Sequence, residues 1–226
     1  MGGRGSSNPR GGGDGFERKG STSITDGKTT IDLSETPLRY GKTDSALDGA
    51  RRVAVEGFEN RYRGAKIENG ATFNADGAIT EQRRGGKGSV KTSVAALNAC
   101  DTFSHNHPRD EGTLGGTFSE ADLSNFSNFG VKTFRAAAKE GTYSISKGNG
   151  FDKDGFKRYF HAEYARITGE TASYVRGLNK QINSMSYSSY LKAFNKAVNG
   201  ELVKLHDVLI AGQKQFGYSY TLERGK

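Results

Sequence analysis

The chain contains the stretch FSHNHP at residues 103–108, followed after a polar, glycine-rich segment by FSEAD at residues 118–122. Alternate residues of an extended segment point to the same side, so His105 and His107 can present their rings together. Pro108 stiffens the exit from this strand and ends its pairing. Ser119 opens a helix, and Asp122 lies one turn into it, so its carboxylate can point back toward the loop. The stretch therefore predicts a strand, a loop and a helix that gather two imidazoles and one carboxylate.

Two imidazoles and one carboxylate make three protein ligands and leave a fourth position for water, which is typical of a catalytic zinc site. Zinc lowers the pKa of a bound water to about 7 and polarises a carbonyl, and a general base completes such a site. Two alternatives need no metal. Ser119 and Asp122 also fit a capping box, and a His-x-His pair is common by chance. The combination of both motifs on consecutive elements favours the metal site.

The composition limits the kinds of protein that this chain can be. It has 226 residues, 33% of them hydrophobic, with 32 glycines and a net charge of +8. This length suits one packed domain, or a domain with a helical appendage, and does not require two domains. The positive charge favours acidic partners, nucleic acid among them. The single cysteine, Cys100, excludes an intramolecular disulfide and a cysteine-rich zinc site. No apolar run approaches the ~20 residues that span a bilayer, so we expect a soluble, cytoplasmic protein with no membrane partner.

The chain divides into three predicted parts. Residues 1–29 are poor in apolar side chains and are expected to be a disordered Gly/Ser/Arg-rich leader. Residues 30–150 alternate strands and helices, and residues 151–226 are mainly helical and end in a strand. Strands alternating with helices predict an α+β (α/β-like) fold with a mixed sheet flanked by helices and a helical C-terminal extension.

Local patterns place several elements within these parts. We predict a helix over residues 46–58 capped by residues 43–45, a hairpin over 67–81 and a basic glycine loop over 82–89. The last is either an anion-binding or substrate-facing flap or an ordinary solvated loop, and the absence of a complete phosphate-loop motif favours the second. In the C-terminal region, helical periodicity is interrupted near residues 168–169 and 184–188. The final strand is expected within residues 216–222.

The pattern His-x-His-Pro, then Ser-x-x-Asp, with a glutamate upstream on a strand, resembles the JAB/MPN (JAMM) zinc metalloprotease superfamily, and within it the prokaryotic and phage branch. The resemblance covers about residues 60–148. It implies a JAB/MPN-type fold and a Zn²⁺-dependent metallopeptidase or isopeptidase, whose protein or peptide substrate is often ubiquitin-like. It also implies a phage- or prophage-encoded protein of the host cytoplasm or the virion. The alternative is a nucleic-acid-associated or virion-associated protein on a JAB-like fold without peptidase activity.

Carried over residue by residue, the resemblance implies that His105, His107 and Asp122 bind zinc. It assigns Ser119 to positioning the water or stabilising the oxyanion, and Glu68 to the role of general base. Glu56 and Glu59 compete for the base role, but both fall in the preceding helix. The eleven residues 108–118 between the second histidine and the serine are more than the family usually has, so this loop carries an insertion. The residue between the histidines, Asn106, replaces the common Ser or Thr, with little expected effect on ligation.

Overall fold

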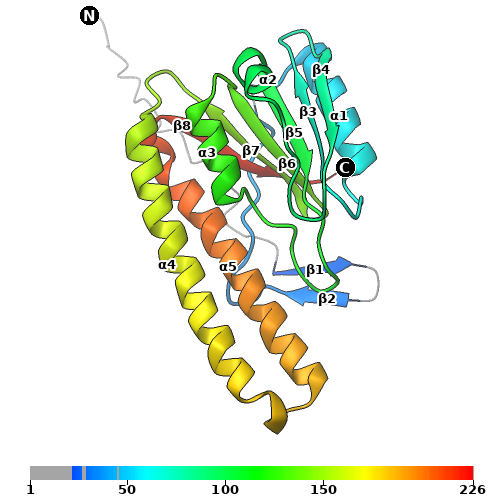
Figure 1. Cartoon of the computed structure of the whole chain (residues 1–226), viewed down its shortest axis with the longest axis vertical. Helices are drawn as coiled ribbons and strands as arrows, with labels where there is room; N and C mark the ends of the chain where they lie inside the picture. Colours follow the sequence, from blue (N-terminus) through cyan, green and yellow to red (C-terminus); the bar gives the residue numbers. More distant parts are fainter. Residues whose placement is uncertain (1–21, 27–28, 45, 226) are drawn as a thin grey trace, which may run out of the picture.

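The computed structural model describes residues 22–26, 29–44 and 46–225. Its centre is a six-stranded mixed sheet in the order β4-β3-β5-β6-β7-β8 (Figure 1). Only β5 and β6 pair in parallel, and every other neighbouring pair is antiparallel. The strands are β3 (Asn69–Phe73), β4 (Ile79–Arg84), β5 (Thr102–Asn106), β6 (Thr133–Ala138), β7 (Gly141–Lys147) and β8 (Tyr218–Glu223). The α+β prediction and the mixed sheet flanked by helices are confirmed.

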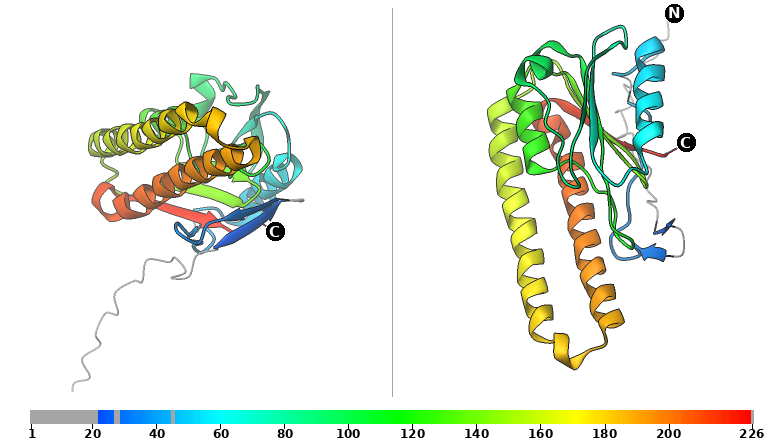
Figure 2. Two further views of the ribbon diagram at one scale, coloured as in Figure 1. Left: turned by 90° about the horizontal axis from the view of Figure 1, so that it is seen from below. Right: turned by 45° about the vertical axis from the view of Figure 1, so that its right-hand side comes forward.

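Three helices cover one face of this sheet, α3 (Glu120–Asn128), α4 (Lys153–Lys180) and α5 (Tyr187–Phe216) (Figures 1 and 2). The main apolar core lies beneath them and contains Phe134 of β6, Phe126 of α3 and Phe156 of α4. Because β8 pairs with β7, the C-terminal region supplies both a strand and the helical cover of the sheet.

The structure confirms one of the two predicted helix breaks. The short 3-10 helix η1 (Ile182–Ser184) separates α4 from α5, as expected. The break predicted at residues 168–169 is wrong, because α4 continues through them. The Thr168 hydroxyl donates to the Tyr164 carbonyl one turn earlier, and Ile167 is fully buried, so packing outweighs the weak helix propensity of Thr and Gly.

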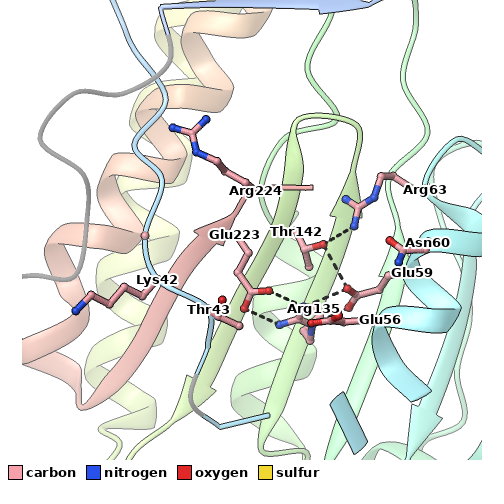
Figure 3. Close-up of a pocket in the computed structure, with 11 residues that line it drawn as sticks. Lys42, Thr43, Glu56, Glu59, Asn60, Arg63, Arg135, Thr142, Glu223 and Arg224 are labelled. Atoms are coloured by element: carbon pink, nitrogen blue, oxygen red, sulfur yellow. Dashed lines mark hydrogen bonds and ion pairs between the residues drawn. The ribbon is translucent and has the colours of Figure 1, made fainter. Parts of the chain in front are cut away.

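The opposite face of the sheet is covered by α1 (Gly49–Tyr62) and is polar in part. Arg135 of β6 is fully buried and donates to Glu59 of α1 (Nε to Oε1, 2.6 Å) and to Glu223 of β8 (Nη2 to Oε2, 3.0 Å). Figure 3 shows this network at the floor of a hollow beside Arg63. Thr142, Ser144 and Ser146 of β7 point to this side, and the Thr142 hydroxyl donates to Glu59.

The predicted start of α1 is wrong. The helix begins at Gly49 after Asp48, and Val53 is 74% exposed. The proposed cap residue Asp44 is instead buried and accepts hydrogen bonds from the hydroxyls of Ser144 and Ser146 on β7. Residue 45, the third residue of the predicted cap, lies outside the described residues. Asp44 Oδ2 thus binds the sheet, while Oδ1 accepts locally from the Ala46 N–H at 2.9 Å, three residues before the helix begins.

Two further boundaries differ from prediction. β1 (Ser23–Asp26) and β2 (Thr29–Asp32) form an antiparallel pair, so the leader expected to reach residue 29 includes a strand. Residues 1–21 lie outside the description. The basic loop expected from residue 82 begins only after Arg84, where β4 ends, and α2 (Val94–Ala99) follows it. Among the described helices, none has the length and apolar character of a bilayer span.

Candidate metal centre

Strand β5 carries both histidines of the motif to the side of the sheet covered by α3, α4 and α5. His105 lies within β5, is 1% exposed and stacks on Phe103, which packs in turn against Phe134. His107 follows directly after the strand, and its backbone N–H still donates to the Ala137 carbonyl of β6. The two Nε2 atoms lie 2.9 Å apart, so the alternation predicted from the sequence does bring the rings together.

Asp122 meets these rings from the first turn of α3. Its Oδ1 lies 3.5 Å from His105 Nε2, and its Oδ2 lies 3.7 Å from His107 Nε2. Ser119 is the N-cap of the helix and forms the capping box with Asp122. Its backbone N–H and its hydroxyl both donate to Asp122 Oδ2, at 2.9 and 2.7 Å. The capping-box and metal-ligand interpretations of this motif are therefore compatible, because the capping box also orients the Asp122 carboxylate toward the imidazoles.

The ligand atoms of His105, His107 and Asp122 all lie within 4.8 Å of one another, and this group can hold a metal ion. Burial alone would raise the pKa of Asp122, but the nearby charges and hydrogen bonds of both histidines outweigh it and hold that pKa well below its usual range. For His107, burial alone would lower the pKa, and the hydrogen bond and charge of Asp122 outweigh it and raise that pKa. The three groups are thus electrostatically coupled.

The loop over residues 109–117 fixes the orientation of His107. The Gly116 carbonyl lies 3.0 Å from His107 Nδ1, so this nitrogen donates and Nε2 is left facing Asp122. A backbone carbonyl that accepts from the other ring nitrogen sets the tautomer of a metal-ligating histidine. By contrast, Nδ1 of the buried His105 has no hydrogen-bond partner among the described residues.

Glu68 lies immediately before β3 and shares a cleft of about 210 Å³ with His107 and Ser119. It is 9% exposed, and burial raises the pKa of its carboxyl despite the opposing charges of His105 and His107. A raised pKa suits a carboxylate that exchanges protons near neutral pH. The competing Glu59 binds Arg135 on the α1 side of the sheet, and so lies away from the histidines.

Asn106 has a structural role that the sequence did not reveal. Its side chain points away from the histidine rings, as expected, and is fully buried. Its Oδ1 accepts from the Asn69 backbone N–H at 2.7 Å, and its Nδ2 donates to the Ile67 carbonyl at 3.1 Å. Asn106 thus holds the residues on both sides of Glu68 against β5. Its position between the two histidines was the only sequence signal available.

The loop over residues 109–117 is anchored by residues far away in the sequence. Asn199 of α5 accepts from the Leu114 N–H and donates to the Gly112 carbonyl, at 2.8 and 3.0 Å. The Glu140 carboxylate, in the turn between β6 and β7, accepts from the N–H groups of Gly115 and Gly116. Neither Asn199 nor Glu140 stood out in the sequence.

The other two histidines and the single cysteine lie outside this centre. His161 is exposed and pairs with Glu120. His206 is fully buried, with its ring nitrogens next to the Tyr220 hydroxyl and the Arg39 carbonyl. Cys100 is buried beside the Leu97 carbonyl, as expected for a small apolar side chain.

Comparison with known proteins gives no assignment. No protein-family model, no curated protein and no solved structure matches the chain. The function must therefore be argued from the site itself.

Proposed function

We propose that this protein is a zinc-dependent hydrolase of peptide or isopeptide bonds on a JAB/MPN-type fold. The observation that carries the proposal is the convergence of His105, His107 and Asp122 beside a cleft that also contains Glu68. The donor set, two imidazole nitrogens and one carboxylate, is that of open catalytic zinc sites.

The geometry of the ligands is compatible with zinc. Two nitrogens bound tetrahedrally at 2.0–2.1 Å would lie about 3.3 Å apart, close to the 2.9 Å between the Nε2 atoms of His105 and His107. The Gly116 carbonyl and the Ser119 donors already orient His107 and Asp122. Bound zinc supplies Lewis acidity, which lowers the pKa of a coordinated water to about 7 and polarises the scissile carbonyl.

The protein residues supply proton transfer and orientation. Glu68 takes the proton of the attacking water and passes it to the leaving amine, and its raised pKa matches both steps. In this structure the Ser119 hydroxyl donates to Asp122, so its first role is to orient that carboxylate. A contact between Ser119 and the water or the oxyanion requires this hydroxyl to turn toward the cleft.

Metal content tests whether the protein binds zinc through His105, His107 and Asp122. Protein purified without added metal should contain about one zinc per chain by elemental analysis, and His107→Ala should lose it. His161→Ala is the matched control, because this exposed histidine lies outside the centre. If the wild-type protein held no stoichiometric zinc and His107→Ala had unchanged stability, the metal site would be rejected.

Activity measurements test whether the protein is a hydrolase with Glu68 as its general base. The wild-type protein should cleave members of a panel of peptides and ubiquitin-like fusions, and Glu68→Ala should retain zinc but lose at least about 100-fold in rate, the scale of general-base catalysis. Cleavage that survived Glu68→Ala would remove Glu68 as the base. Salt-dependent DNA binding that persisted in His105→Ala would instead place the function outside the metal centre.

A further inference from the structure

Glu140 is a buried carboxylate that the proposed chemistry does not use. It lies in the turn between β6 and β7 and is 5% exposed. Its Oε1 accepts from the Gly116 N–H at 2.8 Å and from the Tyr143 hydroxyl at 3.0 Å, and its Oε2 accepts from the Gly115 N–H at 3.1 Å. These three donors are uncharged. Because a buried charge is costly without hydrogen bonds, the carboxylate and the loop hold each other in place.

Gly116 connects this carboxylate to the metal centre. Its N–H donates to Glu140, and its carbonyl accepts from His107 Nδ1 at 3.0 Å. The backbone of Gly116 alone thus links the buried Glu140 carboxylate to His107.

The backbone of Gly116 is specialised for this position. Its φ is +81°, and a Cβ atom placed there would lie 2.6 Å from a methyl carbon of Leu202 on α5. A positive φ strains other residues, and a side chain would also press on α5. The direction of the Gly116 carbonyl therefore depends on this positive-φ conformation. Glu140 stabilises the conformation through the Gly116 N–H, and Leu202 leaves no room for a side chain.

We infer that Glu140 is a positioning residue for His107, acting through Gly116 to keep the proton on Nδ1 and to leave Nε2 facing Asp122. The part of this inference that concerns metal affinity rests on the proposed function. The part that concerns the tautomer does not, because it holds for the metal-free protein. Outer-shell partners of metal-ligating histidines typically contribute 10–100-fold in metal affinity.

The test is Glu140→Gln, in which one carboxylate acceptor becomes an amide donor that faces the Gly115 N–H. Chelator competition should show zinc bound about 10–100-fold more weakly than by the wild-type protein. In metal-free protein at alkaline pH, the ¹⁵N shifts of the His107 ring should move toward a mixture of tautomers. Asp44→Asn is the matched control, since this buried, hydrogen-bonded carboxylate lies on the α1 side of the sheet. Asp44→Asn should leave the zinc affinity and the His107 ¹⁵N shifts at wild-type values.

A second variant keeps the inference testable if Glu140→Gln does not fold. Gly116→Ala should weaken zinc binding and alter the His107 shifts. Gly150→Ala should change neither, because Gly150 has the same φ of +81° but no atom within 4 Å of the added Cβ. Wild-type zinc affinity and wild-type His107 shifts in a folded Glu140→Gln or Gly116→Ala protein would overturn the inference. If the wild-type protein bound no zinc, the proposed function would fail, and the tautomer measurement alone would decide the role of Glu140.

Discussion

Lowering the pH from 7 to 5 is expected to destabilise the folded chain by about 2 kcal/mol through one residue, His206. This histidine of α5 is fully buried. Its Nε2 donates to the Arg39 carbonyl at 2.9 Å, and its Nδ1 accepts from the Tyr220 hydroxyl at 2.8 Å. The same hydroxyl lies 2.8 Å from Thr117 Oγ1 in the loop over residues 109–117. Protonation would place a second donor at Nδ1, against the Tyr220 hydroxyl.

The magnitude follows from the displaced pKa. Burial, together with the charge of Arg39, lowers the pKa of His206 from 6.5 to about 4. Because the folded-state pKa lies below the unfolded-state pKa, the unfolded chain binds more protons in this interval. The contribution of neutral His206 to the free energy of unfolding is therefore complete above about pH 6.5, and it is lost as the pH falls toward 4. At about 1.36 kcal/mol per pKa unit the whole loss is about 3 kcal/mol, of which about 2 kcal/mol falls between pH 7 and pH 5.

Urea unfolding of metal-free protein at pH 7 and pH 5 measures this effect. Between the two values, the wild-type protein should lose about 2 kcal/mol more unfolding free energy than His206→Gln, whose side chain does not titrate. His161→Gln, at an exposed position, should lose as much as the wild-type protein. An equal loss in His206→Gln and wild type would refute the reasoning, because the pH dependence would then come from other groups.

Three further outcomes concern stability and reactivity. Arg135→Met should destabilise the fold by about 3–5 kcal/mol in urea unfolding, because it leaves two buried carboxylates without their cation. The same change at the half-exposed Arg83 should cost about 1 kcal/mol or less. Cys100, whose pKa burial raises to about 11, should react with a thiol reagent at pH 8 only after urea unfolding; fast labelling of the folded protein would contradict its burial. Phe126→Ala should cost about 3–5 kcal/mol by urea unfolding, since the ring is fully buried in the main core.

The features that could be predicted from the sequence depend on neighbours close along the chain. Two-residue alternation predicted that His105 and His107 share one side of β5, and the Ser119 to Asp122 spacing predicted the first turn of α3. The final strand was also predicted from its alternation. Each of these signals lies within one helix or strand, where the spacing between residues determines the side to which their side chains point.

The features that sequence reasoning missed depend on contacts between distant segments. Asp44 is a good helix cap by residue type, but its carboxylate binds hydroxyls of β7 about a hundred residues later. The anchors of the loop over residues 109–117, Glu140 and Asn199, contact it from 24 and 85 residues away. No periodicity links such positions, because the approach of a turn or a helix to a loop is set by packing of the whole fold.

The two histidines of the candidate metal centre are held by different parts of the structure. Strand β5 fixes His105, since its neighbour Ser104 donates to Glu59 on the α1 side at 2.9 Å and Phe103 packs in the core on the other. His107 lies beyond the end of β5, and its ring depends on the Gly116 carbonyl. Changes in the loop over residues 109–117 should therefore act on the centre through His107 and leave His105 in place. In the proposed zinc site, a histidine held by the sheet lies beside one held by a loop, so substitutions in this loop should change metal affinity without disturbing the sheet.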